Sequence, residues 1–349
     1  MDPAKERHIL GLDLVRFGAA AMVMALHYGG RKTGAFTSFG WVGVEVFFVL
    51  SGYVIAYSSE DSTPAKFANA RVIRLLPGVA ICATAAFVAA IITGAYPDPL
   101  HRYLLSLVLW PFGPWLDTVY WTLPVEVAFY ALVWLVLLRR PGDAASKVAW
   151  AIGIASSIYW FWRLAAQYDH RLRAILLPSD TVATFTMLSY GCYFAIGALL
   201  RDMFRTGVSG PRVGLLTACL LAGGAQIAFA SPSPVRADKM VAILIWIALV
   251  GAIPLAVRFN NGAWRYLGRQ APAIRWLGLA TYPLYLLHDT VFAVFGHGLG
   301  GWMTAALAVA ISLGVARWGE RPSQGALRRV LSRLSGTRRA FAADRAVNG

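Results

Sequence analysis

The sequence predicts an all-α membrane protein, a polytopic bundle of about ten transmembrane helices with both termini in the cytoplasm. Composition is the first reason, because 58% of the 349 residues are hydrophobic, against roughly 45–50% in soluble domains. The second reason is spacing, since the apolar residues come in blocks close to the about 20 residues that a helix needs to cross a bilayer. The third is charge. With the N-terminus inside, 23 of the 32 lysine and arginine residues fall in inner segments and 8 in outer loops, counting those at the adjoining span ends, as the positive-inside rule predicts.

The expected spans follow one another along nearly the whole chain. In order they are 9–29, 40–57, 77–96, 119–138, 148–166, 183–200, 213–230, 241–257, 276–295 and 300–317. The first is too long for a signal peptide and contains Asp13 and Arg16, so we expect it to remain uncleaved. The apolar stretch 103–110 is too short to cross and is followed by Pro111 and Pro114. It is therefore expected to be a re-entrant or interfacial segment beside the fourth span.

The chain divides into a membrane domain, residues 1–322, and a basic cytoplasmic tail, residues 323–349. The net charge of +15 reflects orientation rather than nucleic-acid binding, because no aromatic-interleaved basic face is present. The arginines of the tail can also rest on anionic lipid headgroups. Cys82, Cys192 and Cys219 lie in apolar spans as small buried hydrophobes. The six histidines lack zinc-type spacing, so we expect no metal and no permanently bound cofactor.

Two ionisable residues lie inside the first apolar stretch, Arg16 and, near its outer end, His27. A charge at the middle of a membrane helix costs roughly 2.5–3.5 kcal/mol on insertion scales, so each should face protein and have a partner or a task. At about 1.5 Å per residue, Arg16 lies about 16 Å deeper than His27. Glu45, Glu126 and the adjacent pair His288 and Asp289 fall in the outer halves of their spans, at the depth of His27. A common layer of titratable groups usually marks a pathway or a reaction site.

Structural roles and other classes of protein remain open at this point. Asp13 and Arg16 could form a local salt pair that only allows the charge to be buried. Glu45 or His288, taken alone, would be a satisfied structural group. A transporter or exporter would also place such residues along a proton or substrate path, but we see no repeat of the first-half motifs in the second half. A non-catalytic scaffold would not explain the cost of burying Arg16.

Five segments resemble, in order and spacing, the motifs of the membrane-bound acyltransferase-3 family. They are the Arg16 and His27 pair, GWVGVEVFFVLSGYVI (40–55), RVIRLLPGV (71–79), WTLPVEVAFY (121–130) and LGLATYPLYLLHD (277–289). Each motif alone is weak, but the five in register are specific and cover about residues 9 to 322. The resemblance implies an O-acyltransferase of the bacterial inner membrane. Such an enzyme moves an acyl group, expected to be acetyl, from cytoplasmic acyl-CoA to a hydroxyl of an extracytoplasmic glycan or lipid-linked sugar.

The resemblance implies catalytic roles for four residues. His27 would be the general base or an acyl carrier, and Arg16 would hold the donor within the bundle. An imidazole is suited to remove the proton of a sugar hydroxyl as that hydroxyl attacks a thioester. Glu126 or Glu45 would fix the imidazole tautomer and stabilise its cation.

Contacts with the acyl-CoA donor are implied for residues near the inner ends of the second and third spans. Arg71 and Arg74, in the loop after the second span, would bind the CoA phosphates or else only anchor that loop. Ser51 and Gly52 would line a channel beside the pantetheine arm. Alternatively they, like Gly43, would allow close approach of two helices.

Contacts with the acceptor are implied for Trp121, Tyr282 and His288. Pro283, next to Tyr282, would interrupt the backbone hydrogen bonds of its helix and leave backbone groups free to line a cavity. The chain departs from the family pattern where Val127 replaces a second acidic residue. This departure affects the acceptor side more than the donor side, so the identity of the acceptor is left open, as is the oligomeric state.

Overall fold

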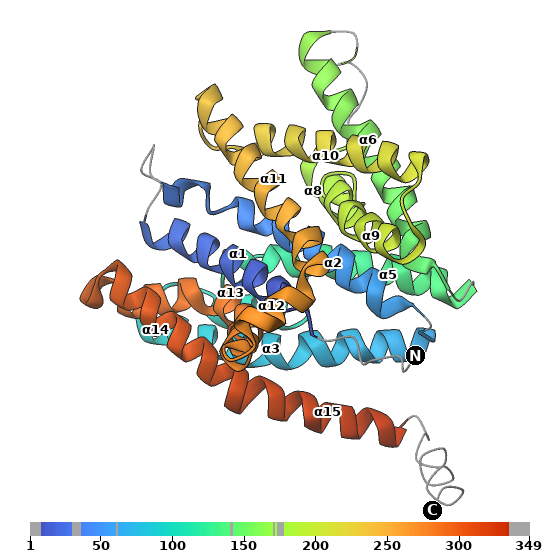
Figure 1. Cartoon of the computed structure of the whole chain (residues 1–349). Helices are drawn as coiled ribbons and strands as arrows, with labels where there is room; N and C mark the ends of the chain where they lie inside the picture. Colours follow the sequence, from blue (N-terminus) through green and yellow to red (C-terminus); the bar gives the residue numbers. More distant parts are fainter. Residues whose placement is uncertain are drawn as a thin grey trace, which may run out of the picture.

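The computed structural model describes residues 8–29, 36–60, 62–139, 142–169, 172 and 178–334, and within these residues every regular element is helical (Figure 1). The first half contains α1 (Leu10–Gly29), α2 (Val42–Ser59), α3 (Pro64–Thr93), α4 (Pro99–Leu107), α5 (Thr122–Arg139) and α6 (Ala144–Tyr168). The second half contains α8 (Asp180–Phe185), α9 (Gly191–Thr206), α10 (Gly210–Ala230), α11 (Arg236–Arg258), α12 (Asn260–Leu267), α13 (Ala271–Leu299), α14 (Gly301–Gly314) and α15 (Arg321–Leu334). The 3₁₀ turns η1 (Phe36–Phe39) and η2 (Thr118–Trp121) precede α2 and α5, and the π-helical turn η3 (Val315–Glu320) joins α14 to α15.

Seven helical stretches of the described chain are long and apolar enough to cross a membrane. They correspond to the first four, the seventh, the eighth and the tenth predicted spans. The predicted spans 148–166 and 276–295 lie in the continuous helices α6 and α13. The prediction of one helix over 183–200 is wrong, because the chain turns between α8 and α9, where Met187 has a positive φ of 64°. The structure therefore supports an all-α membrane bundle with seven candidate spans.

The helix that carries Arg71 and Arg74 begins earlier than predicted. Thr63 caps it by accepting a hydrogen bond from the backbone N–H of Lys66 at 3.2 Å, and Pro64 occupies its first turn. Both features are typical of a helix N-terminus. The placement of the two arginines in a loop is therefore wrong, and α3 holds both side chains at fixed positions.

Close backbone contact joins α2 to α9 inside the bundle. A Cβ atom on Gly52 would lie 2.1 Å from the carbonyl oxygen of Phe194, and one on Gly197 would lie 1.9 Å from that of Val49. Only glycine permits this approach. Gly43 similarly faces a backbone carbonyl of α1, 2.4 Å from the position a Cβ would take. Gly43 and Gly52 thus serve helix packing, one of the two roles expected for them.

The short apolar stretch 103–110 begins in the last part of α4 and continues beyond it. The nine residues of this helix are too few to cross a bilayer. This helix packs on α3 rather than beside the fourth predicted span. The hydroxyl oxygens of Tyr103 and Thr84 lie 3.0 Å apart, and the ring of Tyr103 stacks on that of Phe87 with centroids 4.8 Å apart. An interfacial or re-entrant position remains the expectation for this segment.

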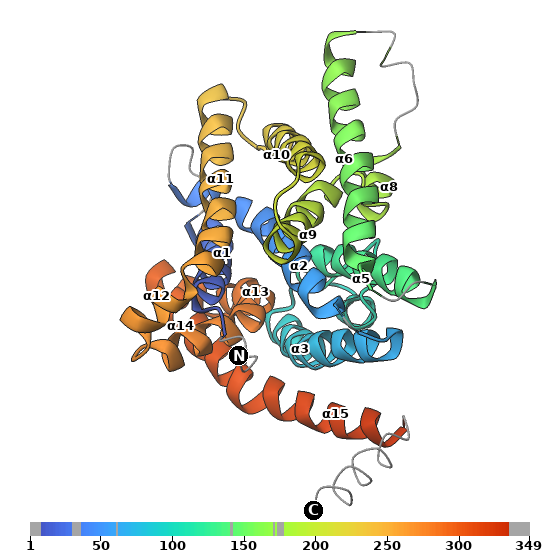
Figure 2. The same ribbon diagram turned by 45° about the vertical axis from the view of Figure 1, so that its right-hand side comes forward.

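The C-terminal helices follow one another as a single long element. α14, η3 and α15 are consecutive, and α15 lies beside α3 in both views (Figures 1 and 2). A π-helical turn is rare and often marks a functional position. The domain boundary predicted after residue 322 falls within α15.

Candidate active site

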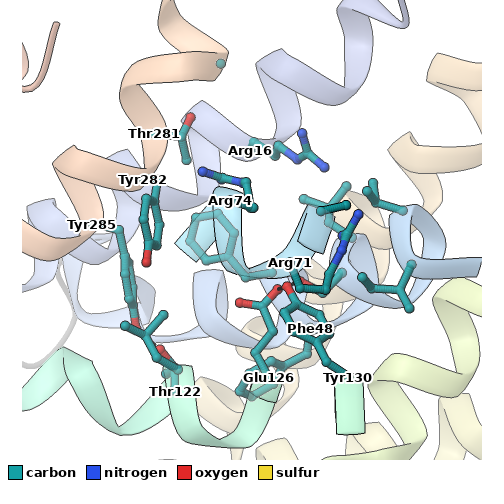
Figure 3. Close-up of a pocket in the computed structure, with 18 of the residues that line it drawn as sticks. Arg16, Phe48, Arg71, Arg74, Thr122, Glu126, Tyr130, Thr281, Tyr282 and Tyr285 are labelled. Carbon is teal, nitrogen blue, oxygen red and sulfur yellow. Dashed lines mark hydrogen bonds between the residues drawn. The ribbon is translucent and has the colours of Figure 1, made fainter. Parts of the chain in front are cut away.

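A cavity of about 350 Å³ lies between α1, α2, α3, α5, α13 and α15. In Figure 3, Arg16, Arg74 and Glu126 surround the same space. Four arginines and one glutamate line the cavity, and they are Arg16, Arg71, Arg74, Arg328 and Glu126. This excess of positive charge suits a ligand that carries several negative groups. We call this space the arginine-lined cavity.

Arg16 projects from α1 into the arginine-lined cavity and also lines a second cavity of about 840 Å³ bounded by α1, α2, α9, α11 and α12. Its guanidinium makes no hydrogen bond and no direct ion pair with any side chain that the structure describes, although the charges of Asp13 and Glu126 lie close enough to attract it. Asp13, the partner considered for a local salt pair, pairs with His8 instead. A cation inside a membrane helix that has no directly bonded partner among the described residues is suited to bind a ligand.

Arg71 and Arg74 lie one turn apart on α3 and both line the arginine-lined cavity. The guanidinium of Arg71 lies over the rings of Phe67 and Tyr130, at 5.4 and 5.7 Å from their centroids. Its Nε is buried without a hydrogen-bond partner among the described residues. Arg74 donates a hydrogen bond to Glu320 at 3.1 Å. Guanidinium groups stacked on rings keep their N–H edges available for phosphate oxygens.

Glu126 faces the arginine-lined cavity rather than His27. Its Oε1 accepts hydrogen bonds from the hydroxyl groups of Ser51 and Tyr130, each at 2.5 Å. The predicted contact between this carboxylate and the imidazole is therefore wrong, because α5 directs the side chain toward α2 and α3. Ser51 lines the cavity and orients the carboxylate.

Glu45 also lies away from His27, on a buried side of α2. Its side chain is in the core, and its Oε2 has no hydrogen-bond partner within the described part of the chain. Its titratable neighbours include Tyr190 and Tyr193. The prediction that either glutamate partners the imidazole is thus corrected, since a depth along a span does not specify the face of the helix.

His27, near the end of α1, forms a hydrogen-bonded group with two residues of α13, which we call the imidazole cluster: His27, His288 and Asp289. Nδ1 of His27 lies 2.6 Å from Nε2 of His288 and 3.1 Å from Oδ1 of Asp289. The two rings stack with centroids 4.9 Å apart. His288 is fully buried, and its Nδ1 points at the carbonyl oxygens of Leu284 and Tyr285, at 3.1 and 2.9 Å.

These contacts assign the protons of both rings. A ring nitrogen directed at a carbonyl oxygen must carry hydrogen, so Nδ1 of neutral His288 is a donor and its Nε2 is an acceptor. Nδ1 of His27 is then the donor toward Nε2 of His288 and toward Asp289. Nε2 of His27 keeps its lone pair, which is the form that accepts a proton from a substrate.

Two carboxylates of this region, Asp289 and Asp117, were not predicted as site residues. Asp289 directly follows His288 and shares its depth in the outer half of the predicted span, but depth does not show which polar groups meet. Asp117 is buried, accepts a hydrogen bond from the N–H of Val119 at 3.1 Å and lies next to Asp289. Because Asp117 lies in a connecting segment outside the predicted spans, its sequence context does not indicate burial in the bundle.

Among the residues that the structure describes, the imidazole cluster is also close enough together to hold a metal ion. One possible ligand atom from each of its three residues lies within 4.8 Å of the other two. However, the two ring nitrogens that face each other are 2.6 Å apart. Two nitrogens that each coordinate a tetrahedral zinc ion at about 2.0–2.1 Å lie farther apart than this. The separation is that of a hydrogen bond, so we interpret the cluster as a proton-transfer group.

Tyr285 and Thr122 stand between the arginine-lined cavity and the imidazole cluster. Both residues line the cavity, and their hydroxyl oxygens are 3.2 Å apart. The ring centroid of Tyr285 is 6.2 Å from that of His288. One layer of side chains therefore separates the end of the cavity from the histidines.

The three acceptor candidates lie at three different places. His288 belongs to the imidazole cluster. Tyr282 lines the arginine-lined cavity, where its ring centroid lies 4.6 Å from the guanidinium carbon of Arg74 (Figure 3). Trp121 packs edge-on against Phe48 of α2, with centroids 6.1 Å apart. The structure thus brings His27 and His288 together but keeps Tyr282 with the arginines.

Comparison with known proteins identifies relatives over most of the chain. The profile of the acyltransferase-3 family, described as an acyltransferase domain, matches residues 9–317. The exopolysaccharide production protein ExoZ of Rhizobium meliloti (strain 1021) is 28% identical over 337 residues, which cover 89% of this chain and 98% of ExoZ. The acyltransferase MdmB of Streptomyces mycarofaciens is 26% identical over 368 residues, which cover 93% of this chain and 87% of MdmB. No solved structure is significantly similar to this chain.

Proposed function

Because this chain belongs to the acyltransferase-3 family, we propose that it transfers an acetyl group from cytoplasmic acetyl-CoA to a hydroxyl of a glycan or lipid-linked sugar at the outer face of the bacterial inner membrane. Membership of an acyltransferase family favours an enzyme over the transporter alternative. One observation carries the finer proposal. The arginine-lined cavity ends one side-chain layer, that of Tyr285, away from His288, and His288 is hydrogen-bonded to His27, whose Nε2 is free to accept a proton.

The proposed class of acceptor rests on the relatives. ExoZ is named as an exopolysaccharide production protein, and MdmB is named as an acyltransferase. A sugar hydroxyl is a weak nucleophile near neutral pH and needs a general base. His27 in the tautomer described above supplies that base.

The donor fits the arginine-lined cavity by charge. Arg71 and Arg74 would bind phosphate groups of CoA, because stacked guanidinium groups offer paired N–H donors. Arg16 lies about 16 Å from His27 along α1, so it would contact the donor between the phosphates and the thioester. The pantetheine arm would pass Ser51, and the thioester would lie at Tyr285 and close to His27.

Acyl transfer then follows from the imidazole cluster. Nε2 of His27 takes the proton of the acceptor hydroxyl as the hydroxyl oxygen attacks the thioester carbonyl carbon. Asp289 and His288 hold Nδ1 in place, and the charge of Asp289 stabilises the imidazolium that forms. Collapse of the tetrahedral intermediate breaks the carbon–sulfur bond, and the imidazolium returns its proton to the sulfur. The products are an acyl ester and CoA with a free thiol.

The orientation in the membrane rests on the charge asymmetry of the loops. The positive-inside rule favours a cytoplasmic location for the first residues of α3 and for α15. The arginine-lined cavity would then be reached from the cytoplasm, and His27 would lie near the outer surface.

The proposal is tested by incubating the purified protein in proteoliposomes with radiolabelled acetyl-CoA and the surface glycan of a strain that lacks the gene. We expect label in the glycan together with an equal amount of free CoA. The His27→Ala variant, which should fold normally, is the matched control without activity. Folded wild-type protein that releases no CoA and labels no glycan would contradict the proposal.

A further inference from the structure

The C-terminal helix α15 contributes two side chains, Gln324 and Arg328, to the arginine-lined cavity. The match to the family profile ends at residue 317. This part of the cavity wall therefore lies beyond the matched acyltransferase domain, in a segment that the sequence predicted to be a basic tail.

A buried carboxylate attaches α15 to α3. Glu320 is 4% exposed, and its Oε1 accepts hydrogen bonds from Arg74 at 3.1 Å and from the side-chain amide of Gln324 at 2.8 Å. Glu320, Gln324 and Arg328 are spaced four residues apart, so they share one face of the helix. Gln324 and Arg328 on this face line the cavity, so the attachment of the helix at Glu320 places the Arg328 side chain at the cavity wall.

Arg328 differs from its neighbour Arg329 in what it faces. Arg328 lines the cavity and makes no ion pair with any residue in the described ranges, whereas Arg329 does not line it and donates its Nε–H to the carbonyl oxygen of Gly325, at 3.3 Å. Both side chains carry the same charge on the same helix. The pair therefore offers a matched comparison between a cation at the cavity and one outside it.

A comparison of the cations around the cavity with the phosphate groups of CoA indicates a role for Arg328. Glu320 neutralises part of the charge of Arg74 while holding its guanidinium in place. CoA carries a diphosphate and, on its ribose, a separate phosphate, so it needs cations at two positions. Arg71 and Arg74 on α3 provide one position, and Arg328 on α15 provides the other.

We propose that α15 is part of the donor site, with Arg328 binding a nucleotide phosphate of acyl-CoA and Glu320 acting as a positioning residue for Arg74. This inference rests on the proposed function, because it takes acyl-CoA as the ligand. It assigns a ligand contact to a segment outside the matched family domain.

The test compares Arg328→Ala with Arg329→Ala, using two donors, acetyl-CoA and acetyl-pantetheine, of which the second lacks the nucleotide. Loss of a charged hydrogen bond to phosphate should raise the KM for acetyl-CoA about tenfold in Arg328→Ala, with kcat unchanged. The same variant should have wild-type kinetics with acetyl-pantetheine, which also shows that it is folded. Arg329→Ala should match the wild type with both donors.

Glu320→Gln tests the positioning role. Loss of the negative charge should raise the KM for acetyl-CoA by about threefold and leave kcat and the kinetics with acetyl-pantetheine unchanged. A purely structural role for Glu320 would instead change the kinetics of both donors together, and that result would overturn this part of the inference.

Equilibrium binding of CoA to the detergent-purified protein separates this inference from the proposed function. Wild-type protein that binds CoA, with Arg328→Ala binding it equally tightly, would overturn the inference and leave the proposed function in place. Weaker binding by Arg328→Ala than by Arg329→Ala supports the inference, even before an acceptor is identified. Wild-type protein that does not bind CoA would reject both.

Discussion

The arginine-lined cavity and the imidazole cluster are held by the protein in opposite ways. In the cavity, Arg16 makes no hydrogen bond with a described side chain, and the Nε of Arg71 is buried without a described partner. In the cluster, three of the four ring nitrogens of His27 and His288 have hydrogen-bond partners. Two arginines of the cavity are thus left available for a ligand, whereas the ring nitrogens proposed to move a proton are fixed in advance.

This difference predicts two kinetic signatures. Changes in the imidazole cluster should lower kcat with little effect on the KM for acyl-CoA, because these groups are proposed to act in the transition state. Changes in the arginine-lined cavity should raise that KM, because its charges are proposed to bind the donor before and during the reaction. The substitutions below test this division, beginning with the largest expected effect.

His27→Ala should have the largest effect. Loss of the general base is expected to lower kcat by about 10²–10⁴-fold, while expression and thermal stability in detergent stay close to wild type because His27 is only partly buried. The measurement is the initial rate of CoA release at saturating acetyl-CoA. A variant that retains wild-type rates would show that His27 is structural.

Asp289→Asn should follow, with kcat lowered by about 10²-fold. The amide keeps the size of the side chain but removes the negative charge that lies 3.1 Å from Nδ1 of His27 and is proposed to stabilise its imidazolium. Asp98→Asn is the control, because it removes the charge of a carboxylate that pairs with Arg102 at the N-terminal end of the short helix α4, outside both regions. Equal kcat values for the two variants would mean that Asp289 takes no part in catalysis.

Arg16→Lys should change the KM rather than kcat. Lysine keeps the charge but lacks the planar set of five N–H donors, so we expect the KM for acetyl-CoA to rise about tenfold. Steady-state kinetics over a range of acetyl-CoA concentrations measure this change. An unaltered KM and kcat would indicate that only the charge at this position matters.

Glu126→Gln should have the smallest effect of the four, a change of about threefold in the KM for acetyl-CoA at constant kcat. The amide oxygen can still accept the hydrogen bonds of Ser51 and Tyr130. Because Glu126 lies in the cavity, its charge influences the donor and not His27. A fall in kcat as large as that of Asp289→Asn would contradict the division of kinetic roles between the arginine-lined cavity and the imidazole cluster.

The sequence predicted part of this arrangement for physical reasons. Burying a charge is costly, so Arg16 and His27 had to be functional or paired, and counting residues along the spans put His288 at the depth of His27. The structure brings these two histidines into contact. Depth does not give the direction in which a side chain projects, and for this reason Glu45 and Glu126 were assigned to the wrong partner.

Other contacts had no signal in the linear sequence. Arg74 and Glu320 are 246 residues apart, and a local pattern does not report a pair that only the packing of α3 and α15 creates. The cap at Thr63 extends α3 through a charged stretch that resembles a loop. The all-α membrane bundle follows from composition and the spacing of apolar residues and was predicted, whereas the site depends on which helix faces meet.

Donor and acceptor are proposed to be reached from opposite faces of the membrane, and the most direct test of this supplies the donor on one face only. Acetyl-CoA is supplied either inside or outside sealed proteoliposomes whose protein orientation is known from protease access to a C-terminal tag, and acyl transfer is measured. We expect acyl transfer only when acetyl-CoA is on the side of the C-terminus, where α15 and the arginine-lined cavity are proposed to open. Equal rates from both sides, or activity only from the side opposite the tag, would contradict this arrangement.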